Sequence, residues 1–137
     1  MRAVLDTNVI YAALRSRQGA SFALLRAVVD GQFEMALSVA LCLEYEDVAL
    51  REPAPLPTAA ATAILDLLVA ISIRPNMDFL WRPQLRDPKD EMVLELAING
   101  HCEYIVTFNV RDFAGCERFG VQAIKPSAFL ALLGGMP

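Results

Sequence analysis

The sequence predicts a three-layer α/β/α fold, in which helices cover both faces of a central, mostly parallel sheet of four or five strands. Short apolar runs that suit buried strands alternate along the whole chain with segments of helical periodicity. This alternation is typical of parallel sheets covered on both faces. The chain has 137 residues, so a single domain over residues 1–137 agrees with the commonest domain size of ~100–150 residues.

The first strand is predicted at residues 3–5, a short apolar run (AVL). Asp6 follows directly and therefore lies at the carboxyl end of the strand, which is the edge where open α/β sheets bind ligands. Thr7 and Asn8 complete a polar turn before a helix over residues 9–14. A plainer interpretation is that Asp6 only caps this helix, because Asp, Thr and Asn are all preferred at that position.

The middle of the chain alternates in the same way. Ser38 is placed to cap a helix, and prolines at positions 53, 55 and 57 stiffen a loop because each fixes φ and lacks a backbone N–H. The elements predicted here are a helix at 20–29, a strand at 33–37, a helix at 39–50, an Ala-rich helix at 58–69 and a short strand at 71–73.

The clearest helix of the chain is predicted at residues 87–99, after an irregular stretch at 74–86 that contains Trp81 and Pro83. Pro88 suits the first turn of this helix, and Gly100 is a stop signal. The remaining predicted elements are a strand at 104–106, a polar turn at 107–113, a strand at 121–124 and a helix at 126–133.

Composition excludes several kinds of site. Cys42, Cys102 and Cys116 are an odd number, at spacings that fit neither a disulfide framework nor a CxxC metal site. His101 is the only histidine, so any metal would be held by oxygen atoms. The formal charge of −4 argues against binding nucleic acid through bulk positive charge. It does not exclude nucleic acid as a substrate.

Hydropathy predicts no membrane segment. The longest weakly polar stretch, at 59–73, is interrupted by Asp66, whereas a spanning helix needs ~20 mostly apolar residues. The N-terminus enters a strand without a cleavable apolar region, so we expect a cytoplasmic protein. The hydrophobic share of 55% exceeds the ~45–50% that is usual. We therefore expect some apolar surface to bind a partner, with the helix at 58–69 contributing to it.

Asp90 is the most informative acid of the helix at 87–99. Apolar residues lie three, four, seven and eight positions after it, so Asp90 heads the buried stripe of that helix. A buried carboxylate needs partners or a ligand, because isolation from water is costly. An acid at a helix N-terminus can instead interact only with the helix dipole, and this interpretation suits Asp87 and Glu91 better.

A second group of acids, EYED, lies on the helix at 39–50. Glu44 and Asp47 lie on nearly the same side of this helix, whereas Glu46 points elsewhere. Spacing alone does not choose between Glu44 and Asp47.

A third region, TFNVRDF, follows the strand at 104–106. Its Asn109 and Asp112 are also plausible caps for a short helix. Together the three regions would bring three or four carboxylates to one site. Two carboxylates ~4 Å apart repel by about 4 kcal/mol at an effective dielectric constant of about 20, so only cations or bound protons make such a site tolerable. Mg²⁺ or Mn²⁺ fits oxygen ligands of this kind.

Four motifs together resemble the PIN domain family, and within it the VapC-type toxins of bacterial toxin–antitoxin pairs. They are VLDTNV at residues 4–9, EYEDV at 44–48, DPKDEMVLELA at 87–97 and IVTFNVRDF at 105–113. Each motif is weak alone, but the four occur in order along essentially the whole chain.

The resemblance implies a metal-dependent ribonuclease with a PIN-like fold. The family's three main acidic positions correspond to Asp6, Glu44 and Asp90, so the resemblance selects Glu44 over Asp47. One or two Mg²⁺ or Mn²⁺ ions held by these three residues would lower the pKa of a bound water and stabilise charge on the scissile phosphate. The implied substrate is RNA, and the implied protein partners are a cognate antitoxin and a second copy of the chain.

The resemblance also assigns supporting residues. Thr7 and Asn8 match the polar pair that steadies the first acid. Many relatives have Asp at a fourth position, where this chain has Asn109, although an Asn followed three residues later by Asp112 also fits the family. Asp112 or Asn109 would complete the ligand shell or orient the attacking water.

Other interpretations remain at this stage. A catalytically silent PIN-like binding or assembly module is favoured by Asn109 and opposed by the three retained acids. Phosphatases of the haloacid-dehalogenase type also begin with an Asp at the first strand end, but they need a second acid two residues later, where this chain has Asn8. The basic residues near the predicted site either contact phosphates or, more simply, are solvated surface charges: Arg82, Arg86, Lys89 and Arg111.

Overall fold

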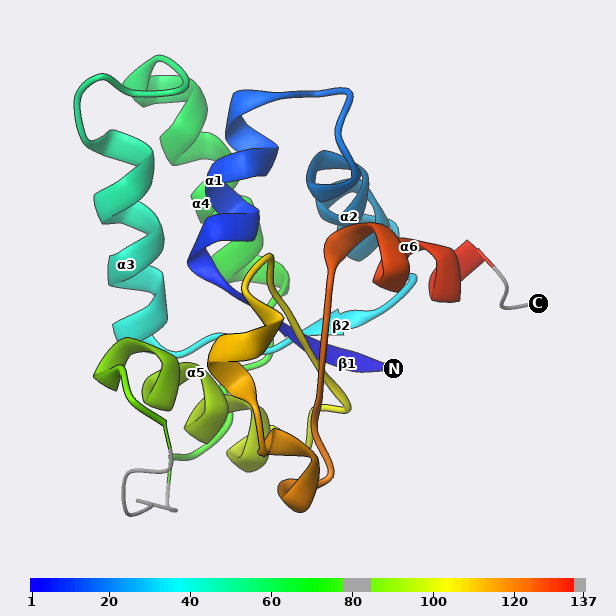
Figure 1. Ribbon diagram of the computed structural model, residues 1–137. Helices are drawn as coiled ribbons and strands as arrows, with labels where there is room; N and C mark the ends of the chain where they lie inside the picture. The colour runs from blue at the N-terminus through cyan, green and yellow to red at the C-terminus, as the bar shows by residue number, and fades with distance from the viewer. Residues whose placement is uncertain (78–84, 135–137) are drawn as a thin grey trace.

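The computed structural model describes residues 1–77 and 85–134 and has the predicted three-layer α/β/α fold (Figure 1). Trp81, Arg82 and Pro83 lie outside the described residues. Within the described part, a four-stranded sheet has the order β2-β1-β3-β4, and every pairing in it is parallel. The strands are β1 (Arg2–Leu5), β2 (Glu34–Met35), β3 (Tyr104–Val106) and β4 (Gln122–Ile124).

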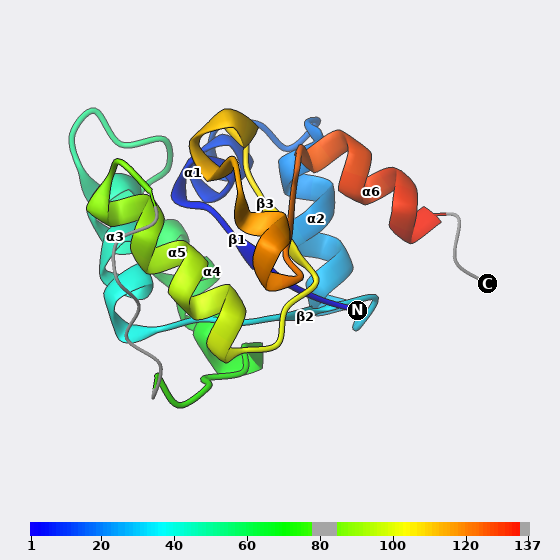
Figure 2. The same ribbon diagram turned by 60° about the horizontal axis from the view of Figure 1, so that its bottom comes forward.

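Helices cover both faces of this sheet (Figures 1 and 2). They are α1 (Thr7–Arg15), α2 (Ala20–Val29), α3 (Val39–Leu50), α4 (Thr58–Ile71), α5 (Pro88–Asn99) and α6 (Pro126–Gly134), with the short 3-10 helices η1 (Val110–Phe113) and η2 (Cys116–Phe119) between β3 and β4. In both views α5 lies across the sheet from α1 and α2. α3 packs against α1 and α4, and α6 packs against α2. None of these helices, within the ranges described, is long and apolar enough to cross a bilayer.

The central strands end at the same level. Leu5 is paired with Val106, and Val106 is paired with Ile124. The first backbone N–H beyond each strand continues the ladder, because Asp6 N donates to Val106 O at 2.9 Å and Thr107 N donates to Ile124 O at 2.9 Å. Asp6 and Thr107 are therefore neighbours at the carboxyl edge of the sheet.

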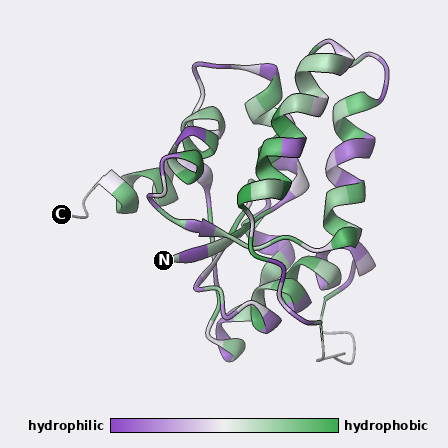
Figure 3. Cartoon of the chain, turned by 180° about the vertical axis from the view of Figure 1, so that it is seen from behind, coloured by the Kyte–Doolittle hydropathy of each residue, from purple (hydrophilic) through white to green (hydrophobic). Residues whose placement is uncertain are grey.

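The strands and the inner faces of the helices form the hydrophobic core. Residues 3–5 are fully buried, as the first apolar run predicted. The rings of Phe33 and Phe129 meet edge to face with centroids 5.1 Å apart, which joins the start of β2 to α6. Figure 3 shows hydrophobic residues along most of the helices. The cysteines are free thiols, as expected: Cys102 and Cys116 are buried and Cys42 is partly buried.

The strand predicted at residues 71–73 is wrong. α4 continues to Ile71, and only Ile73 joins the sheet, through an isolated parallel bridge to Ala36. The N–H of Ile73 donates to Met35 O at 2.9 Å, so this residue extends the β2 edge by one bridge. A short apolar run does not distinguish a strand from the end of a buried helix, which explains the error.

The two acid-bearing helices begin at capped positions. Ser38 Oγ accepts from Leu41 N at 3.1 Å and starts α3, as predicted. Asp87 Oδ1 accepts from Lys89 N at 2.9 Å and starts α5, with Pro88 in its first turn. These caps set where each helix begins relative to the sheet, and hence where its acids lie.

Candidate active site

Acidic side chains from four segments of the chain line one hollow of about 280 Å³ at the carboxyl edge of the sheet. We call it the acidic hollow. All seven residues that the sequence singled out line it: Asp6, Thr7, Asn8, Glu44, Asp90, Asn109 and Asp112. They come from the end of β1 and the start of α1, from α3, from α5, and from η1 with the turn before it.

Asp6 is held by hydrogen bonds on both carboxylate oxygens. Thr7 N donates to Oδ1 at 2.8 Å, and Thr107 Oγ1 donates to Oδ2 at 2.8 Å. Burial raises the pKa of Asp6 above its usual value of 3.8, and the charges of Glu44 and Asp112 raise it further, whereas the two hydrogen bonds lower it. Asp6 is therefore both the N-cap of α1 and a member of the acidic hollow.

Thr107 connects the polar residues of this edge, although it was not among the residues predicted from the sequence. It is fully buried. Its Oγ1 donates to Asp6, accepts from Asn109 N at 3.0 Å and lies 3.5 Å from the donating Asn8 Nδ2. Asn8 Oδ1 in turn accepts from Phe108 N at 3.5 Å. A signal was present in the sequence, because Asp6 and Thr107 both directly follow predicted parallel strands.

Glu44 reaches the hollow from α3. Thr7 Oγ1 donates to Glu44 Oε2 at 3.2 Å, and Lys89 Nζ lies 3.9 Å from Glu44 Oε1. Lys89 is 73% exposed, so this ion pair is solvated and contributes little to stability. The next residue, Tyr45, is buried, and its hydroxyl donates to the backbone oxygen of Leu5. α3 is thereby tied to the end of β1 beside the site.

Asp90 has the most perturbed carboxyl of the site. It is partly buried on the first turn of α5. Burial raises its pKa from 3.8 to about 6, and four carboxylates add to this effect in decreasing order: Asp6, Asp87, Asp112 and Glu44. The carboxylates of the hollow therefore repel one another, and bound protons or cations would reduce this repulsion.

The fourth position is formed by η1. Asp112 N donates to Asn109 O at 3.0 Å, which closes the short turn. Asn109 stands at the N-cap position of η1, yet its side chain makes no capping hydrogen bond. The amide of Asn109 and the carboxylate of Asp112 are exposed on the wall of the acidic hollow.

Three neighbouring acids have other partners. Asp47 also lines the hollow, but it pairs with Arg51 one turn later on α3. Asp87 caps α5, as the dipole interpretation expected. Glu91 differs from that expectation, because it is buried and its Oε2 accepts from Leu85 N at 2.7 Å. Glu91 therefore binds the backbone of the segment that enters α5.

A further hollow of about 520 Å³ adjoins the acidic hollow. It shares Asp87, Asp90 and Asp112 with the acidic hollow, and Arg86 and Arg111 also line it. We call it the arginine hollow. Two of the basic residues noted in the sequence, Arg86 and Arg111, therefore lie beside the acids of the acidic hollow.

The donors fit a hard divalent cation by their chemistry. Carboxylate and amide oxygens are the ligands of Mg²⁺ and Mn²⁺, and the mutual repulsion felt by Asp90 is what a cation would offset. Across the described ranges, no three side chains of Asp, Glu, His or Cys are close enough to form a cage for one ion as they stand. The fit therefore depends on donor type and charge.

The fold and the acidic edge define a class of α/β proteins with an acidic hollow at the carboxyl ends of a parallel sheet. A family model described as the PIN domain matches residues 2–111. The chain therefore belongs to the PIN domain family, which confirms the resemblance seen in the four motifs.

Among solved structures, a chain of the crystal structure of VapBC2 from Rickettsia felis bound to a DNA fragment from their promoter is similar to this protein. The TM-score is 0.59 at 14% sequence identity, and the match covers 91% of this chain and 98% of that chain. At this identity the likeness establishes a shared fold. No curated protein matches significantly.

Proposed function

We propose that this protein is a metal-dependent ribonuclease that hydrolyses phosphodiester bonds in RNA. The observation that carries the proposal is the gathering of four carboxylates, Asp6, Glu44, Asp90 and Asp112, around one hollow. Membership of the PIN domain family supports the same function.

The candidate residues of the acidic hollow take different parts in this proposal. Asp6, Glu44 and Asp90 would hold Mg²⁺ or Mn²⁺, which supplies a bound water of lowered pKa and positive charge at the scissile phosphate. Thr7 donates from its backbone to Asp6 and from its hydroxyl to Glu44, so it sets the spacing of these two acids. Asp112 or Asn109, which line the same hollow, would complete the ligand shell or orient the attacking water.

Cleavage of single-stranded RNA by the purified protein tests the proposal. We expect cleavage with Mn²⁺, none with EDTA, and none by Asp6→Asn, because an amide is a weaker cation ligand than a carboxylate. Glu46→Gln is the matched control: Glu46 lies on the same helix as Glu44 but is exposed and does not line the hollow, so this variant should retain activity. Cleavage that survives Asp6→Asn would point to a contaminant or another site. RNA binding without cleavage would favour the silent binding module.

We also propose that the protein is the toxin of a cytoplasmic toxin–antitoxin pair. An apolar groove of about 280 Å³ lies between α2 and α4 and suits an amphipathic helix of an antitoxin. Val29 and Leu67 at this groove are 47% and 45% exposed, and Arg26 and Asp30 supply charges there. The similar chain belongs to the VapBC2 structure from Rickettsia felis, and this supports a partner of this kind.

Co-purification with the product of a short neighbouring reading frame tests the partner proposal. Leu67→Asp should abolish co-purification, because it places a charge in the apolar groove. Thr62→Asp, at another exposed position of α4, should leave it unchanged. Equal co-purification of both variants would remove the groove from the interface.

We propose in addition that the protein forms a homodimer through α3. Val39, Leu43 and Leu50 are 74%, 59% and 39% exposed, and their spacing of four and seven residues places them on one face of the helix. Light scattering should report a dimer for the wild type and a monomer for Leu43→Glu. A wild-type monomer, or a dimer that Leu43→Glu leaves intact, would contradict the proposal.

A further inference from the structure

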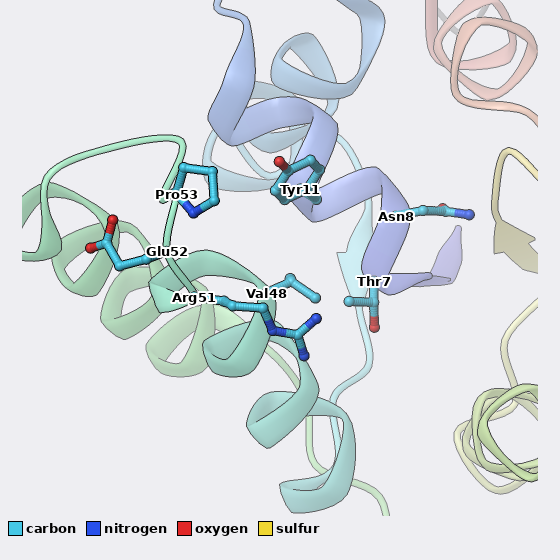
Figure 4. A pocket seen from close by; sticks show the side chains of 7 residues that line it. All are labelled: Thr7, Asn8, Tyr11, Val48, Arg51, Glu52 and Pro53. Carbon is cyan, nitrogen blue, oxygen red and sulfur yellow. The ribbon is translucent and has the colours of Figure 1, made fainter.

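A third hollow, of about 450 Å³, lies between α1 and the segment that ends α3 (Figure 4). We call it the tyrosine hollow. Its lining combines a tyrosine ring, aliphatic surface and polar groups: Thr7, Asn8, Tyr11, Val48, Arg51, Glu52 and Pro53. Thr7, Asn8, Val48 and Arg51 also line the acidic hollow. The two hollows therefore share a wall, and a molecule bound in one would lie next to the other.

Flat apolar surfaces border the tyrosine hollow. Figure 4 shows Tyr11 of α1 and Pro53 of the loop after α3 on its two sides, with Val48 below them. The Arg15 guanidinium lies over the Tyr11 ring, 5.6 Å from its centroid, and this cation–π contact helps to hold the ring in place. Aromatic rings held in this way are the surfaces on which proteins stack the bases of single-stranded nucleic acids.

The charges of the tyrosine hollow favour an uncharged group. Arg51 is paired with Asp47, and Glu52 adds a negative charge. The arginine hollow, on the Asp90 and Asp112 side of the site, instead presents Arg86 and Arg111. Since guanidinium groups bind phosphates well, the backbone of a substrate suits that side, and a base with its sugar suits the tyrosine hollow.

We infer that the tyrosine hollow binds the nucleoside next to the scissile phosphate, with its base against Tyr11. The inference takes its substrate class from the proposed ribonuclease function. The volume of the tyrosine hollow lies within the range of about 300–1,000 Å³ that is usual for small-molecule sites. The RNA strand then runs from the tyrosine hollow, across the acids, to the arginine hollow. An RNA that lacks this base loses binding energy next to the cleaved bond.

Binding, rather than cleavage, gives the direct test. Fluorescence anisotropy would measure the affinity of Asp6→Asn protein, which does not cleave, for a labelled single-stranded RNA in Mg²⁺. Adding Tyr11→Ala should weaken binding on the order of 5- to 100-fold, the usual loss for one base stacked on an aromatic ring. Tyr11→Phe keeps the ring and should bind within about twofold of the parent.

An abasic nucleotide identifies the base concerned. The abasic nucleotide is placed at each position of the RNA in turn, and it should weaken binding most at the position beside the cleaved bond. At that position, the abasic RNA and the Tyr11→Ala variant together should lose no more affinity than the Tyr11→Ala variant alone. Unchanged affinity of Tyr11→Ala, or abasic and Tyr11→Ala effects that simply add, would overturn the inference. If Tyr11→Ala fails to fold, crosslinking of 4-thiouridine RNA to the Tyr11→Phe protein replaces it. Crosslinks to residues 7–11 or 48–53, which line the tyrosine hollow, support the inference, and crosslinks found only elsewhere overturn it.

The two proposals can fail separately. Wild-type cleavage of the same RNA with Mn²⁺, together with affinity that does not depend on Tyr11, would reject the nucleoside site and keep the ribonuclease. Tyr11-dependent affinity without cleavage under any divalent metal would reject the ribonuclease and keep a base-binding hollow.

Discussion

Asp6 combines a structural role, as the cap of α1, with a place in the acidic hollow. Its Oδ1 accepts from Thr7 N and caps α1, while its Oδ2 accepts from the buried Thr107 hydroxyl. Capping and membership of the site are therefore not alternatives. The cap fixes the rotamer of the carboxylate, and Thr107 orients it from the neighbouring strand. Burial still raises its pKa, so the carboxyl binds a proton more readily than a solvated Asp side chain does.

Substitution of Thr107 tests this arrangement at the level of single residues. Thr107→Val keeps the shape but removes the donor to Asp6 and the acceptor for Asn109 N. We expect the pKa of Asp6 to rise further, because a hydrogen bond to its charged form is lost. The free energy of unfolding should fall by about 1–3 kcal/mol, because the hydrogen bonds to the Asp6 carboxylate and from Asn109 N are both lost.

Carboxyl NMR titration of the metal-free protein would measure that pKa, and urea unfolding would measure the stability. Thr107→Ser is the control, because it keeps the hydroxyl and loses only a methyl group. An Asp6 pKa in Thr107→Val that equals the pKa in Thr107→Ser would show that the hydroxyl does not act on the carboxylate.

At the level of elements, the site depends on where α3 and α5 begin. Each helix is 12 residues long, which is marginal in isolation, so caps and tertiary contacts decide its position. Ser38 starts α3, and the Tyr45 hydroxyl ties the same helix to the end of β1. Glu44 lies between these two attachments. Its approach to Asp6 is therefore a property of the helix as a whole.

Removing the cap of α3 should destabilise the protein without touching the acids. Ser38→Ala leaves Leu41 N without the side-chain acceptor it has at 3.1 Å, and we expect a loss of about 1 kcal/mol in the free energy of unfolding. Ser38→Asp restores an acceptor and should recover most of this loss. Urea denaturation at pH 7 measures both. If Ser38→Ala and Ser38→Asp were equally stable, the cap would not be what anchors the helix.

At the level of the whole molecule, folding concentrates negative charge. The chain carries a net charge of only −4, yet six of its carboxylates line one hollow, where the carboxyl of Asp90 reaches a pKa of about 6. The folded protein therefore binds a proton more tightly at this hollow than the unfolded chain does, so its stability should depend on pH. If the proposed metal binds there, stability should also depend on the concentration of that metal.

The sign of the pH dependence follows from the raised pKa of Asp90. Because the folded value of about 6 exceeds the usual 3.8, its contribution favours folding at low pH and is lost as the pH rises through about 6. In EDTA, wild-type protein should therefore lose stability relative to Asp90→Asn between pH 4 and pH 7. Urea unfolding across that range measures the difference, and parallel curves for the two proteins would contradict the prediction.

Part of the fold could be read from local sequence. The apolar run before Asp6, the cap at Ser38 and the stop signal at Gly100 are short-range features, and the helices and strands they predict are present. Residues 71–73 could not be assigned in this way. Their apolar character suits both a helix end and a strand, and only packing of α4 against the rest of the protein decides between them.

The placement of the candidate residues was predictable to a similar extent. That Asp6 and Asn109 stand at strand ends followed from the chain order, and they do line one hollow. The buried Thr107 and the bond from Leu85 to Glu91 were missed, since they depend on which segments become neighbours. The tyrosine hollow was missed for the same reason, because Tyr11 and Pro53 are 42 residues apart in the sequence.

By itself, the sequence determined the alternation of strands and helices, the polar residues at the strand ends and the oxygen donors available to a cation. These follow from periodicity, capping and composition, which are local properties. Only the tertiary structure decided which oxygens meet, how far burial raises each pKa and what adjoins the acids. Distances and desolvation are set by the packing of segments that are distant in the chain, so they cannot be read from the residues on either side of each acid.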